Sequence, residues 1–187
     1  MRKMTELYRE SYRELRRVRT VTTAAMLMAV SVILGYFTIE AGPYLKIGFG
    51  SVVNQFVYYL FGPVTGAVYG GVLDLVRYVV KPTGGYFPGF TLDAILAGVI
   101  YGTVLYRRPL TFRRALAGHF LVAVICNVCL GTLWLSMMSG KAVLVLIPAR
   151  LLKNILMWPV ESALFYVIAR KLESAGLVRA IRRFQLG

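Results

Sequence analysis

The chain alternates between long apolar runs and short polar breaks. The apolar runs cover about residues 21–39, 51–61, 64–80, 91–106, 115–138 and 142–169. Runs of this kind are typical of membrane-crossing helices, which need about 20 apolar residues each. The run at 51–61 is shorter, so we expect it to begin in the preceding loop or to be tilted and shielded by protein. Gly62 and Pro63, which follow it, predict a tight turn. The pattern predicts an all-α membrane protein with six transmembrane helices.

The first twenty residues follow a different pattern. Their apolar side chains recur at helical spacing among Arg and Glu, at Met4, Leu7, Tyr8, Tyr12, Leu15 and Val18. A helix with one apolar and one basic face typically lies in the plane of an anionic leaflet. We therefore predict an interfacial amphipathic helix over residues 1–20, a six-helix transmembrane domain over 21–170 and a basic tail over 171–187.

Charge fixes the expected orientation of these helices. The chain is 58% hydrophobic and 16% charged, with a net charge of +14. Of its 22 Lys and Arg residues, seven lie in 1–20, four in 107–114 and five in 170–187. Such clusters beside apolar runs mark cytoplasmic segments, so we expect both termini to be cytoplasmic. The same distribution argues for the lipid bilayer, and against nucleic acid, as the partner of the basic residues.

Small residues recur four positions apart in three of the apolar runs. The pairs are Ala25 and Ala29, Gly66 and Gly70, and Gly98 and Gly102. This spacing lets helices approach closely. We expect the two glycine pairs to pack inside the bundle. For Ala25 and Ala29, internal packing and contact with another membrane subunit both remain open.

The break at residues 81–90 is rich in Gly, Pro and aromatic residues and lies between two strongly apolar runs. The expected orientation places it outside the cell. Irregular backbone at membrane depth survives only where protein or a water-filled cavity satisfies its polar groups. We therefore predict that this segment forms a lid or wall over a polar ligand.

Ionisable residues within the apolar runs are candidates for function, because such groups are costly in a membrane. Asp74 and Arg77 lie three positions apart and could pair with each other. Glu161 is expected to pair with a basic residue near the inner face. Arg150, Lys153 and Asn154 form one polar stripe, and Asn127 lies at similar depth in the preceding run.

Together these residues predict an outward-facing pocket of positive charge. Lys46 and Lys81 would add to its charge from the loops, and Tyr86, Phe87 and Phe90 could stack on a planar ring. The implied ligand is anionic at one end and planar at the other. Asp93 or Asp74 could accept paired hydrogens from an amino-substituted heterocycle, because a carboxylate offers two acceptor oxygens.

The chain lacks the patterns that would predict catalysis. It has no Walker A sequence, no HExxH and no Ser-His-Asp set with suitable spacing. Cys126 and Cys129 lie inside an apolar run without a second cysteine pair, so we expect them to pack in a helix. The sequence predicts no catalytic residue, no metal and no cofactor.

Several stretches resemble a known family. They are residues 42–50 (GPYLKIGFG), 60–63 (LFGP), 86–92 (YFPGFTL) and 98–102 (GVIYG), together with Arg150, Lys153, Asn154 and Pro159. Over about residues 20–172 the chain resembles the substrate-binding S component of energy-coupling factor (ECF) vitamin transporters. The combination is similar to the folate-specific branch of that family. Residues 25–29 (AMLMA) resemble the family's AxxxA motif, which contacts the transmembrane coupling subunit.

The resemblance implies a mechanism and a set of partners. Such a protein lies in the bacterial cell membrane as a multi-pass subunit and captures folate from outside. It docks on a coupling subunit that carries two ATPases, and then reorients to release the vitamin inside. ATP hydrolysis would belong to those partners, so the chain itself would not be an enzyme. The implied substrate-binding residues are Lys46, Arg77, Tyr86, Phe87, Phe90, Asp93, Asn127, Arg150, Lys153 and Asn154, and the implied partner-interface residues are Ala25 and Ala29.

One residue differs from the pattern of the folate-specific branch, so other vitamins remain alternative ligands. The resemblance leads us to expect a small hydroxyl residue after the Phe-Thr-Leu run, where this chain has Asp93. An S component for another vitamin, such as thiamin, pantothenate or a related heterocycle, is therefore the first alternative. A membrane scaffold subunit without transport function is the second, and a membrane enzyme is the third.

Overall fold

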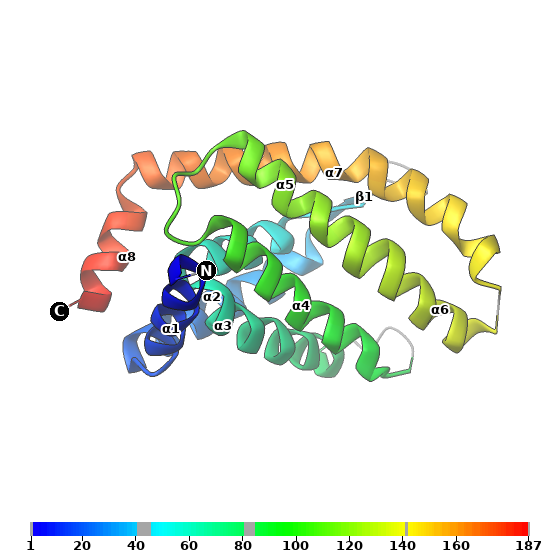
Figure 1. The fold of residues 1–187 in the computed structure, drawn as a ribbon, viewed down its shortest axis with the longest axis horizontal. Coiled ribbons are helices and arrows are strands. Elements are labelled where there is room, and N and C mark those ends of the chain that lie inside the picture. The colour runs from blue at the N-terminus through cyan, green and yellow to red at the C-terminus, as the bar shows by residue number, and fades with distance from the viewer. Residues whose placement is uncertain (1, 41–45, 81–84, 141, 187) are drawn as a thin grey trace.

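The computed structural model describes residues 2–40, 46–80, 85–140 and 142–186. Most of these residues are helical (Figure 1). In chain order the elements are α1 (Arg2–Leu15), α2 (Val18–Tyr36), β1 (Thr38–Glu40), β2 (Lys46–Gly48), α3 (Phe49–Val80), α4 (Pro88–Leu105), α5 (Phe112–Val122), the π-helix η1 (Ala123–Leu130), α6 (Gly131–Ser139), α7 (Val143–Ser174) and α8 (Leu177–Leu186). The predicted all-α architecture is confirmed except for β1 and β2, a short antiparallel pair.

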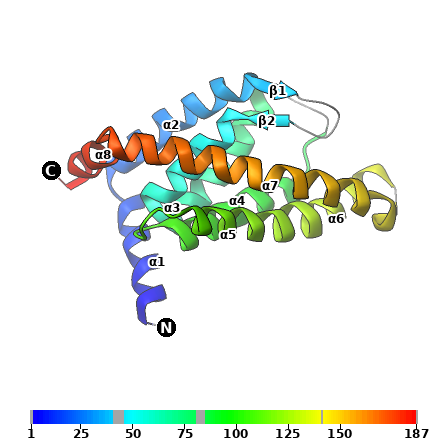
Figure 2. The ribbon, with the colours of Figure 1, turned by 90° about the horizontal axis from the view of Figure 1, so that it is seen from above.

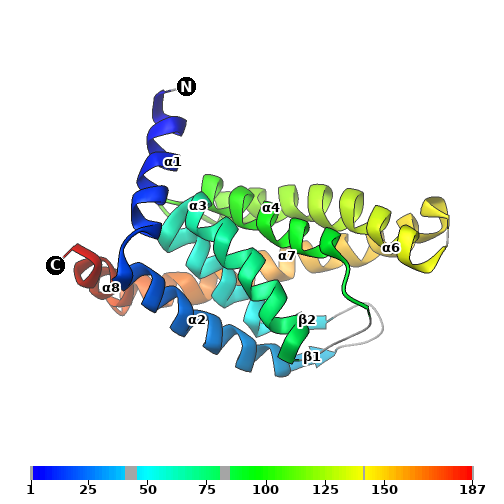
Figure 3. The same ribbon diagram turned by 90° about the horizontal axis from the view of Figure 1, so that it is seen from below.

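The two ends of the helix bundle are formed by different elements. Figures 2 and 3 show α1 and α8 at one end of the bundle, with both chain termini nearby. The strands β1 and β2, the end of α6 and the start of α7 lie at the opposite end. We call these the terminal end and the loop end. The predicted basic tail contains α8, whose Val178 is buried among the core residues.

Five helical stretches in the described part of the chain are long and apolar enough to cross a membrane. They are α2, α3, α4, the continuous stretch Phe112–Ser139 and α7. Helix α3 is central: 78% of its most apolar 18-residue segment is buried inside the protein. In α7, only 6% of such a segment is buried. Large apolar side chains of α7, such as Leu144, Val145 and Ile155, are therefore exposed and suited to contact lipid.

Helix α3 reverses direction at Gly62. In a straight helix, residues 54 and 69 would lie about 22 Å apart along the axis. Instead, the hydroxyl of Tyr69 donates to Asn54 Oδ1 at 3.1 Å, and the ring of Tyr58 packs edge-on against Tyr69. Gly62 has a φ of 84°, a left-handed conformation that favours glycine. The sequence prediction of a tight turn at Gly62 and Pro63 is thus confirmed, and the predicted helices 51–61 and 64–80 are the two halves of a hairpin.

The second half of α3 packs very closely against α4. A Cβ atom at Gly98 would lie 2.3 Å from the carbonyl oxygen of Gly66, and one at Gly70 would lie 2.4 Å from that of Ala94. Only glycine permits this backbone approach. The expectation that both glycine pairs pack inside the bundle is confirmed, and the contact fixes where α4 holds its side chains relative to α3.

Helix α1 is fastened to the turn of the hairpin by Ser11, which is fully buried. The Ser11 hydroxyl donates to the Phe61 carbonyl at 2.8 Å and accepts from the backbone amides of Val64 and Thr65. Ser11 therefore satisfies free amides at the start of the second half of α3, as an N-cap residue does. A salt bridge of 3.0 Å between Glu10 and Arg107 also joins α1 to the segment that follows α4.

Candidate functional site

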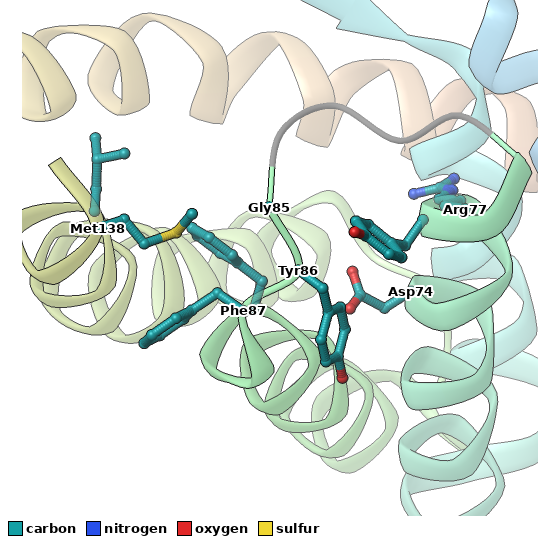
Figure 4. A pocket seen from close by; sticks show the side chains of 9 residues that line it. Asp74, Arg77, Gly85, Tyr86, Phe87 and Met138 are labelled. Carbon is teal, nitrogen blue, oxygen red and sulfur yellow. The ribbon is translucent and has the colours of Figure 1, made fainter.

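A cavity of about 470 Å³ lies at the loop end, between α3, α4 and α6 (Figure 4). We call it the lid cavity. Its lining residues are Asp74, Arg77, Tyr78, Gly85, Tyr86, Phe87, Phe90, Leu135 and Met138. Its size falls within the range of small-molecule sites. It brings together four of the predicted site residues, namely Arg77, Tyr86, Phe87 and Phe90.

The start of α4 positions the aromatic residues of this cavity. Phe87 is extended, with φ −131° and ψ 118°, and Pro88 begins the helix directly after it. Proline suits this position because its fixed φ is helical and its missing N–H would have no partner there. The last residues of the predicted loop 81–90 are therefore helical. Residues 81–84, with the predicted Lys81, lie outside the described part of the chain.

Phe87 packs against two further rings. Its centroid lies 6.1 Å from that of Phe90 and 5.7 Å from that of Trp134. Gly89 makes this contact possible, because a Cβ atom there would lie within 2.6 Å of both Phe87 and Trp134 ring atoms. The result is an aromatic cluster from α4 and α6 that covers one side of the cavity.

Asp74 and Arg77 do not pair with each other. Asp74 accepts from the Thr91 hydroxyl at 2.7 Å, and that hydroxyl in turn lies 2.9 Å from the hydroxyl of Tyr86. Arg77 donates to the buried Ser31 hydroxyl at 2.9 Å. Each side chain is thus held by a different neighbour, and Figure 4 shows both facing the lid cavity.

A second group of predicted residues lies beside the cavity. Asp93 accepts from the indole N–H of Trp134 at 3.2 Å. Arg150 donates to the Asn127 carbonyl at 2.8 Å, and the Asn127 side chain donates to Asn154 at 3.1 Å. These contacts join α4, η1, α6 and α7. The π-helix η1 places Asn127 toward α7, and such distortions often occur at functional sites.

Trp134 connects the two groups, since it contacts Phe87 on one side and Asp93 on the other. Sequence reasoning did not select Trp134, although a tryptophan in an apolar helix has an N–H that needs an acceptor. Lys153 is exposed and lines neither group. Lys46 belongs to β2, but its side chain lies outside the described part of the structure.

The predicted partner-interface residues lie on a different surface. Ala25 and Ala29 line an apolar groove of about 360 Å³ together with Met28, Val32, Ile33 and Val76. Both alanines are exposed in the chain on its own. The groove is formed mainly by α2.

Comparison with known proteins identifies the family. Residues 19–169 match the family model described as "ECF transporter, substrate-specific component". The chain belongs to this family. The match covers α2 through most of α7, and therefore includes the lid cavity and the groove around Ala25 and Ala29.

Individual relatives of this S component carry names that refer to folate. The chain is 28% identical over 170 residues to "Folate transporter FolT" of Clostridium novyi (strain NT), which covers 91% of this chain and 99% of the relative. It is also 28% identical to "Folate transporter FolT" of Leuconostoc mesenteroides, over 80% of this chain and 84% of that protein. A solved structure described as "Crystal structure of FolT bound with folic acid" superposes with a TM-score of 0.70 at 34% identity, covering 81% of this chain and 92% of that one.

Proposed function

We propose that this S component captures folate at the loop end and delivers it across the bacterial cell membrane. The observation that carries the proposal is the similarity, at 34% identity and a TM-score of 0.70, to a FolT structure bound with folic acid. The lid cavity supports it physically. Folate combines flat rings with two carboxylates, and the cavity joins an aromatic cluster to the guanidinium of Arg77.

We further propose roles for the predicted site residues. Phe87, Phe90 and Tyr86 pack on the flat part of the vitamin, because aromatic faces stack well on planar rings. Arg77 and Arg150 attract its carboxylates, and Lys46 and Lys153 add positive charge to the site. Asn127 holds the Arg150 guanidinium through its backbone carbonyl, and its side chain donates to Asn154, whose own side chain donates to the Arg150 carbonyl. Asp93 orients Trp134 against Phe87.

The proposed transport cycle needs partner subunits. In it, the membrane is crossed six times, counting both halves of α3, and both termini face the cytoplasm. The groove around Ala25 and Ala29 docks on a transmembrane coupling subunit that carries two ATPases. Docking and ATP turnover by those partners reorient the S component, so that folate bound from outside is released inside.

A thermal-shift panel of vitamins tests the substrate. Folate should raise the melting temperature of the detergent-purified chain in a dose-dependent way, while thiamin and pantothenate should not. Stabilisation by another vitamin alone would overturn the folate assignment and favour that vitamin. The absence of stabilisation by any vitamin would favour a scaffold role.

A further inference from the structure

Arg77 carries a positive charge that no neighbouring carboxylate balances among the side chains that the structure describes. Asp74, three positions earlier, is engaged by the Thr91 hydroxyl instead. Within that described part, no Asp or Glu oxygen lies within 4.0 Å of the guanidinium. Arg77 is half-buried and faces the lid cavity (Figure 4). A half-buried cation without a counterion favours an anionic ligand, because a partly desolvated charge is costly until it is paired.

The hydroxyl of Ser31 holds this guanidinium from α2. Arg77 Nη2 donates to Ser31 Oγ at 2.9 Å, and Ser31 is completely buried. An arginine can only donate, so the serine oxygen accepts and its own proton must point elsewhere. The nearest acceptor for that proton is Asn54 Oδ1, at 2.6 Å, which also accepts from the Tyr69 hydroxyl at 3.1 Å. The direction of each bond is thus determined, and both halves of α3 help to orient Ser31.

Gly50 leaves the space that this contact needs. A Cβ atom there would lie 2.6 Å from the Ser31 carbonyl oxygen and 3.1 Å from Arg77 Nη2. The shorter distance would force the two backbones apart, so α2 and the first half of α3 approach this closely only because residue 50 is glycine. The bond between Ser31 and Arg77 therefore lies in a closely packed part of the protein, where it can hold the guanidinium still.

An arginine that is held in place before the ligand arrives should bind it more tightly. A free arginine side chain has many rotamers, and fixing it only on binding lowers the affinity. The bond to Ser31 uses one of the five N–H donors of the guanidinium. The other donors remain for a carboxylate, which arginine can bind through two parallel hydrogen bonds.

We propose that Ser31 is a positioning residue for folate binding, whose hydroxyl holds the Arg77 guanidinium in the lid cavity for a carboxylate of the vitamin. The inference rests on the proposed function, in which Arg77 attracts that carboxylate, and adds a residue of α2 to it. Because Ser31 is completely buried, it acts through Arg77 and not by touching the ligand. Its contribution is therefore specific to ligands with a negative charge.

The variant Ser31→Ala tests this role with two ligands. Folate affinity, measured by isothermal titration calorimetry, should fall about fivefold because the guanidinium is no longer fixed. The second ligand is the bis-amide of folate, in which both glutamate carboxylates are replaced by neutral amides of nearly the same shape. Its affinities for the variant and for the original chain should agree within about twofold, since it has no carboxylate for Arg77 to bind.

Two further variants control for changes in packing. Thr23→Ala removes another buried hydroxyl of α2, one that donates to the Arg19 carbonyl of the same helix, and should leave both affinities unchanged. Ser31→Cys nearly keeps the size of the side chain but offers only a weak acceptor, so it should reproduce the selective loss of folate affinity. It also replaces Ser31→Ala in the comparison if that variant shows no melting transition.

A double variant tests whether Ser31 acts through Arg77. Arg77→Gln alone should weaken folate binding, and adding Ser31→Ala to it should cause no further loss, because the group that Ser31 positions is already absent. Losses that add in the double variant would show that Ser31 acts on binding by another route, and would overturn the proposal.

The outcomes separate this inference from the proposed function. If the original chain binds folate and Ser31→Ala binds it equally well, the role of Ser31 fails while the folate function stands. Equal losses for folate and its bis-amide in that variant would show a general structural effect and would also overturn the inference. If the original chain does not bind folate at all, the proposed function itself fails.

Discussion

Trp134 links the aromatic residues of the site to its polar residues. Its ring contacts Phe87 and its indole N–H reaches Asp93. The other tryptophan, Trp158, donates to the Leu116 carbonyl and packs against Phe120, and neither of these neighbours lines the lid cavity. Trp134 packs against Phe87, which does line the lid cavity, so only Trp134 has a ring neighbour at the proposed vitamin site.

This difference gives a direct prediction. Folate binding should quench the fluorescence of Trp134, because the vitamin would occupy the cavity formed beside Phe87. The variant Trp158→Phe should retain most of the folate-induced quenching, and Trp134→Phe should lose most of it. The opposite pattern in a fluorescence titration would place the ligand away from the lid cavity.

Phe87 should contribute strongly to affinity, since it lines the lid cavity and packs against both Phe90 and Trp134. Phe87→Ala should weaken folate binding at least tenfold, a loss of about 1.4 kcal/mol. Isothermal titration calorimetry measures this. Phe120→Ala removes an exposed ring of α5 that does not line the lid cavity, and it should leave affinity unchanged. Equal affinities of the two variants would refute the role of Phe87.

At the scale of elements, the hairpin of α3 and its attachment to α1 hold the bundle together at the terminal end. Three of the bonds that join them involve the hydroxyl of Ser11. The backbone of Gly62 packs directly against Ser11, since a Cβ atom at Gly62 would lie 2.8 Å from the Ser11 hydroxyl.

Removing this hydroxyl should destabilise the fold. Ser11→Ala leaves the partly buried amide of Val64 and the buried amide of Thr65 without their acceptor, at a cost of about 1–2 kcal/mol. The melting temperature in detergent should fall, with folate affinity nearly unchanged. Ser174→Ala removes an exposed hydroxyl at the end of α7 and serves as the control. A Ser11→Ala chain as stable as the control would show that α1 is held by other contacts.

Most of the helices could be predicted from the sequence, because long apolar runs and helix-breaking residues act on the local chain. The six apolar runs correspond to helices, and Gly62 with Pro63 marked the reversal correctly. The helix boundaries differ by a few residues. The helix α8 in the basic tail and the pair β1–β2 were not predicted, since neither follows from a long apolar run.

The site was predictable in part. Aromatic residues near a break suggested a lid, and Tyr86, Phe87 and Phe90 do line one cavity with Arg77. Which groups hold Asp74, Arg77 and Asp93 could not be predicted, because Thr91, Ser31 and Trp134 become their neighbours only after folding.

At the scale of the whole molecule, ligand capture and partner docking use separate surfaces. The groove of Ala25 and Ala29 lies on α2, and none of its lining residues also lines the lid cavity. A change in the groove should therefore leave the vitamin site intact. This separation is what a subunit needs if it binds its substrate alone and passes it on with the help of partners.

Leucine at Ala25 and Ala29 should fill the groove and block close approach of a partner helix. The double variant should bind folate with unchanged affinity but support no folate uptake in cells that also produce the coupling subunit and its ATPases. Ala117→Leu changes an exposed alanine of α5 outside the groove and should permit uptake. Loss of folate binding in the double variant would refute the separation of the two surfaces.

The vitamin carried by the chain as isolated from cells tests the central claim most directly. The chain should be produced in folate-containing medium, purified in detergent without added ligand, and denatured so that its bound small molecules can be quantified by mass spectrometry. The account predicts folate at close to one molecule per chain, and far less in the Phe87→Ala variant purified in parallel. Absence of folate from the original chain, or a different vitamin in its place at comparable amounts, would contradict the account.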